Sequence, residues 1–209
     1  MRSISIGRKL VLGCAALALP VGMMTMVGVQ AASAGSPPVT GTGTVSCTGA
    51  TGQFGFKPAL TFTGTSPETA SVKVTLHGCS AGGTTNVTTS NFNGSGKGSL
   101  SASTNNCTGL AGTQAVSGSV SIKWTGKAGT AKLNNTTLTL TSITGLAVGA
   151  NGNAGFSFSN QATSGSFAGS LSGELDSNQT AATLAGPSGC GAKKGMKKIN
   201  IVAGTASQP

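Results

Sequence analysis

The chain has 209 residues and a formal net charge of +10, with 13 Lys and Arg residues against three Asp and Glu residues. One His, no Tyr and three acids leave few side chains for acid–base or nucleophilic catalysis, so composition argues against an enzyme. Scarce charges and periodic apolar residues also argue against a disordered chain. We therefore expect a folded, non-catalytic protein without cofactor or metal.

Residues 1–34 predict a secretory signal peptide. Arg2, Arg8 and Lys9 precede an uncharged apolar run over residues 10–29, and Ala32-Ser33-Ala34 follows with small residues where a signal peptidase cuts. We expect cleavage after Ala34, with Ala31 as the alternative site. The predicted product is secreted, extracellular and, once cleaved, not an integral membrane protein.

Two other readings of the N-terminal segment are open. The apolar run is long enough for an uncleaved membrane anchor, but Pro20 and three glycines interrupt it. Cys14 could carry a lipid, but the apolar stretch before it is too short to act as its own hydrophobic region. The C-terminal residues 204–209 are not hydrophobic, so no C-terminal anchor is expected.

Removal of the signal peptide leaves 175 residues, a suitable size for one domain. Ten lysines against three carboxylates give this part a net charge of +7. We expect a flexible leader at residues 35–44 and a single β domain at residues 45–205.

The β domain is predicted from apolar residues that alternate with polar ones, as in half-buried strands. The alternating sets, in chain order, are Val72, Val74 and Leu76; Val120, Ile122 and Trp124; Leu138 and Leu140; Phe167, Leu171 and Leu175; and Ile199 and Ile201. Gly, Ser and Asn clusters between them, at residues 78–86, 93–98, 149–155 and 186–191, are interpreted as turns. No helical period stands out. The prediction is an all-β fold, a single antiparallel sandwich or barrel.

The large aromatic side chains are expected to fill the core. They are Phe54, Phe56, Phe62, Phe156, Phe158, Phe167 and Trp124. Sugar-binding surfaces and protein interfaces rely on Trp and Tyr, so a single Trp and no Tyr make both less favoured.

Four cysteines, Cys47, Cys79, Cys107 and Cys190, remain after cleavage. An even number in an oxidising compartment predicts two disulfides, whereas wide spacings and one His argue against metal ligation. Three pairings are possible, and we prefer Cys79–Cys107 with Cys47–Cys190, the second joining the first strand to the last.

The densest charge cluster contains four lysines close to the C-terminus, Lys193, Lys194, Lys197 and Lys198. They form a candidate anion-binding site for an anionic envelope polymer or lipid head groups. The alternative is that they only keep an exposed strand soluble and unpaired. Nucleic acid is not expected, because the mature part has no Arg and no aromatic residues interleaved with its basic ones.

Two motifs invite a catalytic interpretation. Residues 78–82 match the G-x-S-x-G pattern of a nucleophile elbow, but the single histidine, His77, precedes Ser80 and no helix is predicted to follow. Glu174 and Asp176 lie two residues apart on a predicted strand, roughly 6.5–7 Å between Cα atoms. That separation suits a glycosidase pair, but a solvated strand end is the favoured interpretation, and a weak cation site is a further alternative.

The landmarks follow a fixed order along the chain: Cys47, Phe56 to Leu60, Cys79, Cys107, Ile122 to Trp124, Gly165 to Gly169 and Cys190. This order resembles a group of secreted actinobacterial proteins of unknown function, with the likeness covering most of residues 45–205. The resemblance implies an extracellular β-rich domain and supplies no activity, ligand or catalytic residue.

Three functions are consistent with these observations. The preferred one is a secreted, non-catalytic domain that binds a ligand at the cell envelope or outside the cell. The alternatives are a small secreted hydrolase that uses Glu174 and Asp176, and a structural or adhesive surface protein.

Overall fold

A computed structural model describes residues 36–107, 112–146, 148–149 and 151–209. These residues form one compact unit. The predicted signal peptide, both cleavage sites and Cys14 lie outside the described residues. Within the described ranges, no helix has both the length and the apolar character needed to cross a membrane.

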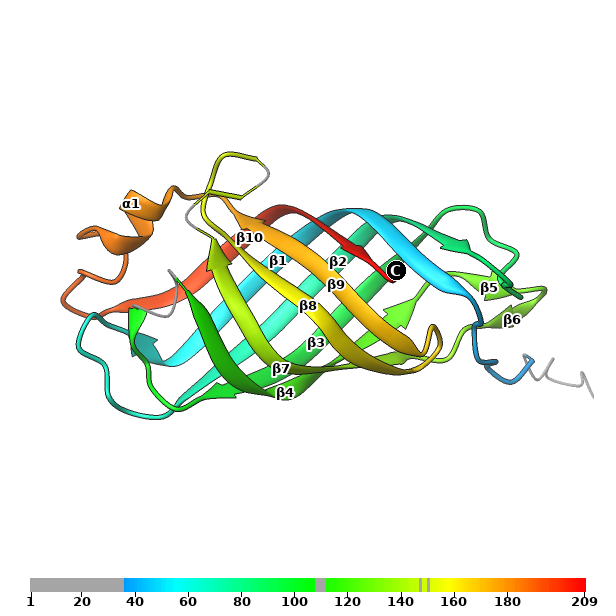
Figure 1. The fold of residues 1–209 in the computed structure, drawn as a ribbon, viewed down its shortest axis with the longest axis horizontal. Helices are drawn as coiled ribbons and strands as arrows, with labels where there is room; N and C mark the ends of the chain where they lie inside the picture. The colour runs from blue at the N-terminus through cyan, green and yellow to red at the C-terminus, as the bar shows by residue number, and fades with distance from the viewer. Residues whose placement is uncertain (1–35, 108–111, 147, 150) are drawn as a thin grey trace, which may run out of the picture. The chain divides into compact units, whose positions relative to one another are not determined.

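Eight antiparallel strands close into a barrel in the order β1–β10–β9–β8–β7–β4–β3–β2 (Figure 1). They are β1 (Thr44–Leu60), β2 (Glu68–Gly82), β3 (Phe92–Ala102), β4 (Thr113–Trp124), β7 (Thr136–Leu146), β8 (Gly155–Gly165), β9 (Gly169–Ser177) and β10 (Met196–Ser207). Between β4 and β7, strands β5 (Lys127–Ala128) and β6 (Ala131–Lys132) pair as a separate hairpin. The all-β prediction is confirmed, and of its two forms the barrel is the one observed.

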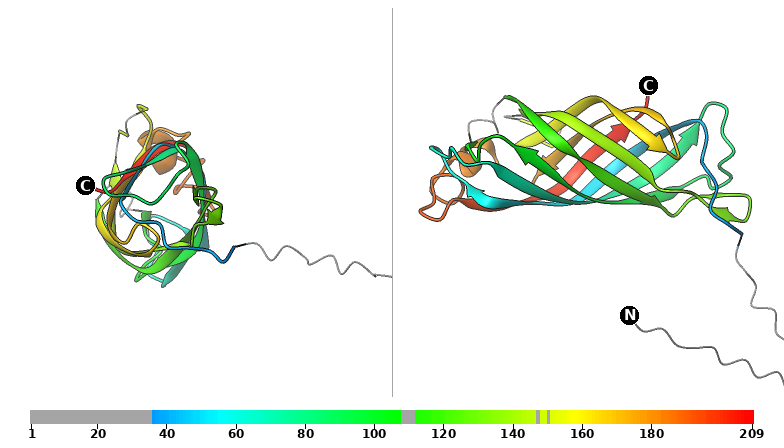
Figure 2. Two further views of the ribbon diagram at one scale, coloured as in Figure 1. Left: turned by 90° about the vertical axis from the view of Figure 1, so that its right-hand side faces the viewer. Right: turned by 90° about the horizontal axis from the view of Figure 1, so that it is seen from below.

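Connections between consecutive strands alternate between the two ends of the barrel (Figure 2). The α1 end carries the β1–β2, β3–β4, β7–β8 and β9–β10 connections, the last of which contains the short helix α1 (Ala181–Ala185). The opposite end carries the β2–β3, β4–β7 and β8–β9 connections. We call it the aromatic end because the rings of Phe92, Trp124 and Phe167 pack together there. Helix α1 was not predicted, because a helix of five residues is too short to show a helical period.

Strand β3 corrects the prediction of a turn at residues 93–98. Its glycines face the barrel interior, and Lys97 and the serines of the strand face outward. A Cβ on Gly96 would lie 2.8 Å from Val74 Cγ1 and 3.1 Å from Val120 Cγ1. The glycines therefore leave room for the branched side chains of β2 and β4, so a Gly-rich segment is a strand here and not a turn.

Most of the predicted core aromatics are buried or half-buried in the barrel. Phe62 was wrongly assigned to the core: it follows the end of β1, and 48% of its surface is exposed. Phe92, which the prediction omitted, is buried at the start of β3. Both errors arise at strand ends, where alternation no longer fixes which way a side chain points.

Three of the buried aromatic rings close the aromatic end of the barrel. The centroid of Phe167 lies 6.0 Å from that of Phe92 in a stacked arrangement and 5.3 Å from that of Trp124 in a T-shaped one. Phe167 sits in the β8–β9 turn with φ of 54°, so the strand expected to include it begins at Gly169 instead. Trp124 Nε1 donates a hydrogen bond to Thr136 Oγ1 at 2.8 Å, which satisfies the buried indole.

The segment expected as a leader makes hydrogen bonds at the aromatic end. Gly41 N donates to Ser166 Oγ at 2.9 Å, and Phe167 N donates to Gly41 O at 2.9 Å. Val39 forms a parallel bridge with Leu133. The described part of this segment, from residue 36 onward, thus packs against the turn that holds Phe167.

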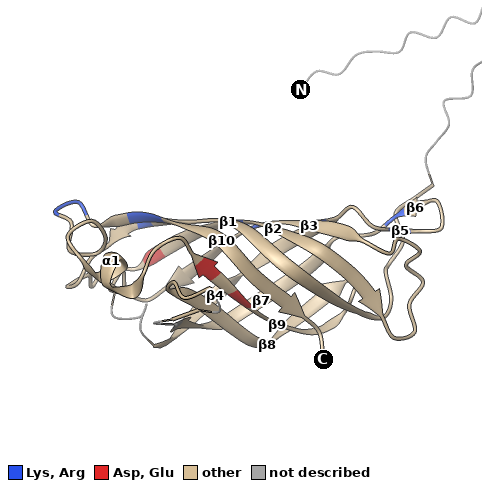
Figure 3. Ribbon diagram, turned by 90° about the horizontal axis from the view of Figure 1, so that it is seen from above, with Lys and Arg blue, Asp and Glu red and all other residues tan. Residues whose placement is uncertain are grey.

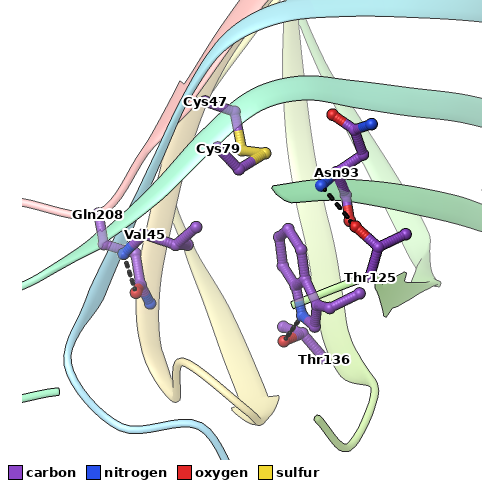
Figure 4. The surroundings of a disulfide bond; sticks show 8 residues. Val45, Cys47, Cys79, Asn93, Thr125, Thr136 and Gln208 are labelled. Atoms are coloured by element: carbon purple, nitrogen blue, oxygen red, sulfur yellow. Dashed lines mark hydrogen bonds between the residues drawn. A yellow bond between two sulfur atoms is a disulfide. The ribbon is translucent and has the colours of Figure 1, made fainter. Parts of the chain in front are cut away.

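Two disulfides are present, as predicted, but the preferred pairing was wrong. Cys47 pairs with Cys79 and Cys107 pairs with Cys190. Cys47 and Cys79 lie directly opposite each other on neighbouring strands β1 and β2, with a Cα–Cα distance of 3.9 Å (Figure 4). Strand register brings them together, and register is not visible in the spacing of cysteines along a sequence.

Candidate functional site

The lysine cluster occupies the last part of the β9–β10 connection and the start of β10. A series of turns after α1 brings Cys190 N to Leu184 O at 2.8 Å and Gly195 N to Ala192 O at 2.8 Å. The Cys107–Cys190 disulfide ties this connection to the segment after β3. Gly195 has φ of +66°, and a Cβ there would lie 2.5 Å from Leu60 O, so the close approach to β1 requires glycine.

An irregular register places two consecutive lysines on the outer surface. Lys198 is paired with Gly55 and Met196 with Leu60, so β1 has a longer segment than β10 between these two pairs. Strict alternation would direct one of Lys197 and Lys198 into the barrel, whereas both are exposed. Alternation in β10 is thus broken next to this register shift, and two positive charges instead of one face outward at this position.

The lysines surround a hollow of about 450 Å³ on the α1 end. Its lining residues are Asn178, Gln179, Ser188, Lys194, Gly195, Met196, Lys197, Lys198 and Asn200. Three of the four predicted lysines are thus brought together. The fourth, Lys193, is exposed on the same turn but does not line the hollow. Figure 3 shows this basic region in the loop beside α1 and at the start of β10.

The chemistry of this lysine hollow suits an anion. Its lining contains three ammonium groups, three side-chain amides and a hydroxyl, and no acid is among the described residues that line it. Like charges held together without a carboxylate repel one another, and a bound anion relieves that repulsion. The amides and the hydroxyl add further hydrogen-bond donors.

Sequence reasoning missed the three amides, Asn178, Gln179 and Asn200. Asn178 and Gln179 follow directly after β9, and Asn200 lies in β10. The backbone hydrogen bond from Asn178 N to Asn200 O (3.3 Å) holds the two segments side by side. Asn and Gln are common in turns, so nothing in the local sequence distinguished these from the many others.

Glu174 and Asp176 line a second, smaller hollow of about 240 Å³ on the outer wall, together with Thr48, Asn151 and Thr205. Asp176 is only 1% exposed, and its Oδ2 accepts a hydrogen bond from Asn151 N at 3.2 Å. A Cβ on Gly149 would lie 1.9 Å from Asp176 Oδ1, so the β7–β8 connection packs directly on this carboxylate. The structure gives Asp176 a role in holding that connection.

The G-x-S-x-G motif at residues 78–82 forms the end of β2. No helix follows it among the described residues that lead to β3. His77 Nε2 lies 2.9 Å from Thr51 Oγ1 on the neighbouring strand. The motif therefore lacks the strand–turn–helix geometry of a nucleophile elbow.

The barrel interior is a packed core. Its central cavity measures about 40 Å³ and is lined by apolar side chains, among them Phe54, Val72 and Leu138. An engineered apolar cavity that binds benzene measures about 150 Å³, several times larger. The interior therefore does not offer the space by which larger β-barrels enclose a small molecule.

One ionisable group, Glu68, lies inside the barrel at the α1 end. It borders a cavity of about 30 Å³ beside Phe56, Leu60 and Ala70, and is 7% exposed. Burial in these surroundings raises the pKa of Glu68 from 4.5 to about 7. The sequence held a signal for this position, since Glu68 has the same parity as Ala70 and Val72 of β2, which face the core.

No protein-family model, curated protein or solved structure matches this chain. The fold itself defines the class: a small, closed, antiparallel β-barrel stapled by two disulfides. Function has to be argued from the sites on this barrel.

Proposed function

We propose that this protein is a secreted, non-catalytic binding protein that takes anionic groups into the lysine hollow at its α1 end. The observation that carries the proposal is the convergence of Lys194, Lys197 and Lys198 on one hollow of about 450 Å³ whose described lining contains no acid. The anionic groups belong to material of the cell envelope or the extracellular space.

Export is part of this proposal. It is supported by the predicted signal peptide, by the resemblance to secreted actinobacterial proteins, and by two disulfides, which persist in oxidising compartments. A partner that carries anionic groups outside the cytoplasm also accounts for the positive charge of the mature part, because an excess of lysine attracts such partners at long range.

The test is titration of the secreted protein with tripolyphosphate over a salt series. We expect K194Q/K197Q/K198Q to weaken binding at least tenfold, and binding by the native protein to weaken as salt rises because exposed charges are screened. The matched control K123Q/K127Q/K132Q removes the same charge near the other end of the barrel and should leave the affinity within about twofold. Affinity that neither salt nor the K194Q/K197Q/K198Q change reduces contradicts the proposal.

A hydrolase that uses Glu174 and Asp176 is the second candidate, since both carboxylates border one hollow with Asn151. The coverage of Asp176 by the β7–β8 connection weakens it, because a catalytic carboxylate has to reach the substrate. Hydrolysis of chromogenic glycosides that E174Q abolishes without loss of stability would favour this candidate over the binding protein.

A structural or adhesive surface protein is the third candidate, and self-association through an unpaired strand edge would favour it. Closure of the barrel pairs each of its eight described strands on both sides, so strand addition has no edge to use there. The β5–β6 hairpin is the exposed two-stranded element, and it places Lys127 opposite Lys132, where charge disfavours pairing with another copy.

A further inference from the structure

The lysines outside the hollow are not scattered over the barrel. The sequence has no lysine in β7, β8 or β9, whereas β10, β1, β2, β3, β4, β5 and β6 each contain at least one. Lys73, Lys97 and Lys123 alternate with core residues on β2, β3 and β4, and all three are exposed. One wall of the barrel is therefore basic and the opposite wall is free of lysine.

Strand register arranges these lysines in a continuous line. Lys198 in β10 pairs with Gly55 in β1, and two residues along β1 towards the aromatic end Gln53 pairs with Lys73. Lys73 is directly opposite Lys97. From one strand to the next, the lysines therefore either stay level along the barrel or move closer to the aromatic end.

The same line continues to the β5–β6 hairpin. Lys123 pairs with Ser95, two residues beyond Lys97 in β3 and again nearer the aromatic end. Lys127 and Lys132 follow in the hairpin, opposite each other. The path from Lys198 to Lys123 spans about 23 Å. This length combines about four spacings between neighbouring strands with a displacement of about four residues along the strands. We call Lys73, Lys97, Lys123, Lys127 and Lys132 the lysine stripe.

The stripe contains two pairs of like charges in directly opposed positions, Lys73 with Lys97 and Lys127 with Lys132. Such cross-strand pairs destabilise a sheet. The surrounding outward positions are hydroxyls, among them Ser71, Ser95 and Ser99, and the one carboxylate on β1 to β4, Glu68, faces the interior. On the outer face of β1 to β4, therefore, no acidic side chain neutralises the stripe.

We propose that the lysine hollow and the lysine stripe together bind a flexible linear polyanion, a chain of repeated anionic groups that begins in the hollow and follows the stripe to the β5–β6 hairpin. This inference rests on the proposed function and identifies its partner. From Lys198 in the hollow to Lys123 in the stripe, the path crosses five consecutive strands of an eight-stranded barrel, about half of the circumference, so no flat surface can touch all of it. A flexible chain can follow that path, whereas a lipid bilayer cannot.

The residues of the stripe also indicate which kind of polyanion it can bind. The chain has no Tyr, and its single Trp is buried, so the stripe offers no large aromatic surface on which bases or sugar rings could stack. Lysines act as point charges without the planar geometry of arginine, which suits repeated phosphate or carboxylate groups on an aliphatic backbone.

The experiment compares a short and a long probe, tripolyphosphate and long-chain inorganic polyphosphate, at equal phosphate concentration. For native protein we expect the long chain to bind at least tenfold more tightly, because it reaches the stripe. K73Q/K97Q/K123Q should remove most of that gain and lower the slope of log affinity against log salt by about one per lysine. It should leave tripolyphosphate binding unchanged.

A pair of single variants provides a control of matched charge. Ser95→Glu adds an acid between Lys97 and Lys123, while Ser164→Glu adds one on the lysine-free wall in β8. Both positions are exposed. We expect Ser95→Glu to weaken long-chain binding severalfold and Ser164→Glu to change it by less than twofold.

The possible outcomes separate this inference from the function on which it rests. If K73Q/K97Q/K123Q binds long-chain polyphosphate as tightly as native protein, the stripe is not a binding track, even though the hollow still takes tripolyphosphate. If K194Q/K197Q/K198Q has no effect on either probe, the proposed function itself fails. Polyglutamate distinguishes carboxylate from phosphate chains, and tighter binding of single-stranded DNA or of anionic vesicles than of polyphosphate overturns the inference.

Discussion

The two ends of the barrel are built on different principles. At the aromatic end, rings of Phe92, Trp124 and Phe167 pack together, and Gln208 Nε2 donates to Phe167 O at 2.7 Å. At the α1 end, lysines gather without an acid in the described lining of their hollow, and Glu68 is buried among apolar side chains. The difference lies in what gathers at each end: packed aromatic rings at one, and exposed lysines beside a buried carboxyl group at the other.

The first test of this comparison removes an aromatic ring. We expect Phe167→Ala to lower the free energy of unfolding by about 3–5 kcal/mol, because it empties a fully buried position. Phe62→Ala at the α1 end is the matched control and should change it by less than about 1 kcal/mol, since half of that side chain is already exposed. Urea denaturation measures both, and equal losses would show that the two ends are equally important for stability.

The second test removes each disulfide in turn. Loop-closure entropy alone gives roughly 4.5 kcal/mol for Cys107–Cys190 and 3.7 kcal/mol for Cys47–Cys79, since their sequence separations are 83 and 32 residues. We expect C107A/C190A to be the less stable variant. We also expect it to weaken tripolyphosphate binding, because Cys190 holds the turn that precedes Lys194.

The binding measurement is the sharper half of that test. C47A/C79A, at the aromatic end, should bind tripolyphosphate as native protein does at temperatures where it remains folded. If both disulfide variants lost affinity equally, the separation between a stabilising end and a binding end would be wrong.

The third test uses pH and concerns Glu68. Its pKa is raised to about 7 in the folded protein, so the neutral form is favoured there. The stability that this group contributes is therefore complete below about pH 4.5 and is lost as the pH rises through 7, a change on the order of 2 kcal/mol. Thermal unfolding at several pH values measures it.

Glu68→Gln keeps the shape of the side chain and cannot ionise. We expect this variant to lose the decline in melting temperature between pH 4.5 and 7 and to exceed native protein in stability at pH 8. If native protein and Glu68→Gln show the same pH profile, then Glu68 is not the group that titrates.

The smallest effect is expected on the basic wall. Lys73→Gln relieves the repulsion with Lys97 directly opposite, and should raise the free energy of unfolding by about 0.2–1 kcal/mol at low salt. Lys123→Gln is the control, because its cross-strand partner is Ser95. The gain should disappear at high salt, where screening already weakens the repulsion. A gain of equal size for Lys123→Gln would show that net charge matters and not the opposed pair.

The alternation of apolar and polar residues was sufficient to predict much of the fold. Val72, Val74 and Leu76 face the core as predicted, and so do Val120 and Ile122, because side chains of a strand point to opposite faces in turn. The prediction failed where a segment shows no alternation of apolar and polar side chains. Glycine has no side chain whose polarity could indicate which face of a strand it occupies, so the sequence predicts a turn at residues 93–98 where the structure has β3.

The candidate site was only partly predictable. Four nearby lysines indicated an anion site, but the sequence did not show that Lys194, Lys197 and Lys198 share a hollow or that Lys193 stays outside it. The hollow depends on the broken alternation at the start of β10 and on amides from β10 and from the residues after β9, which come together only when the barrel closes.

What the sequence determined by itself is therefore local. Period-two alternation fixed the all-β class, and four cysteines fixed the count of two disulfides. Closure into a barrel, the pairing of Cys47 with Cys79, and the line from Lys198 to Lys123 were decided by tertiary structure. The physical reason is that each depends on strand register, and register is set by pairing between segments far apart in the chain, about which a single strand carries no information.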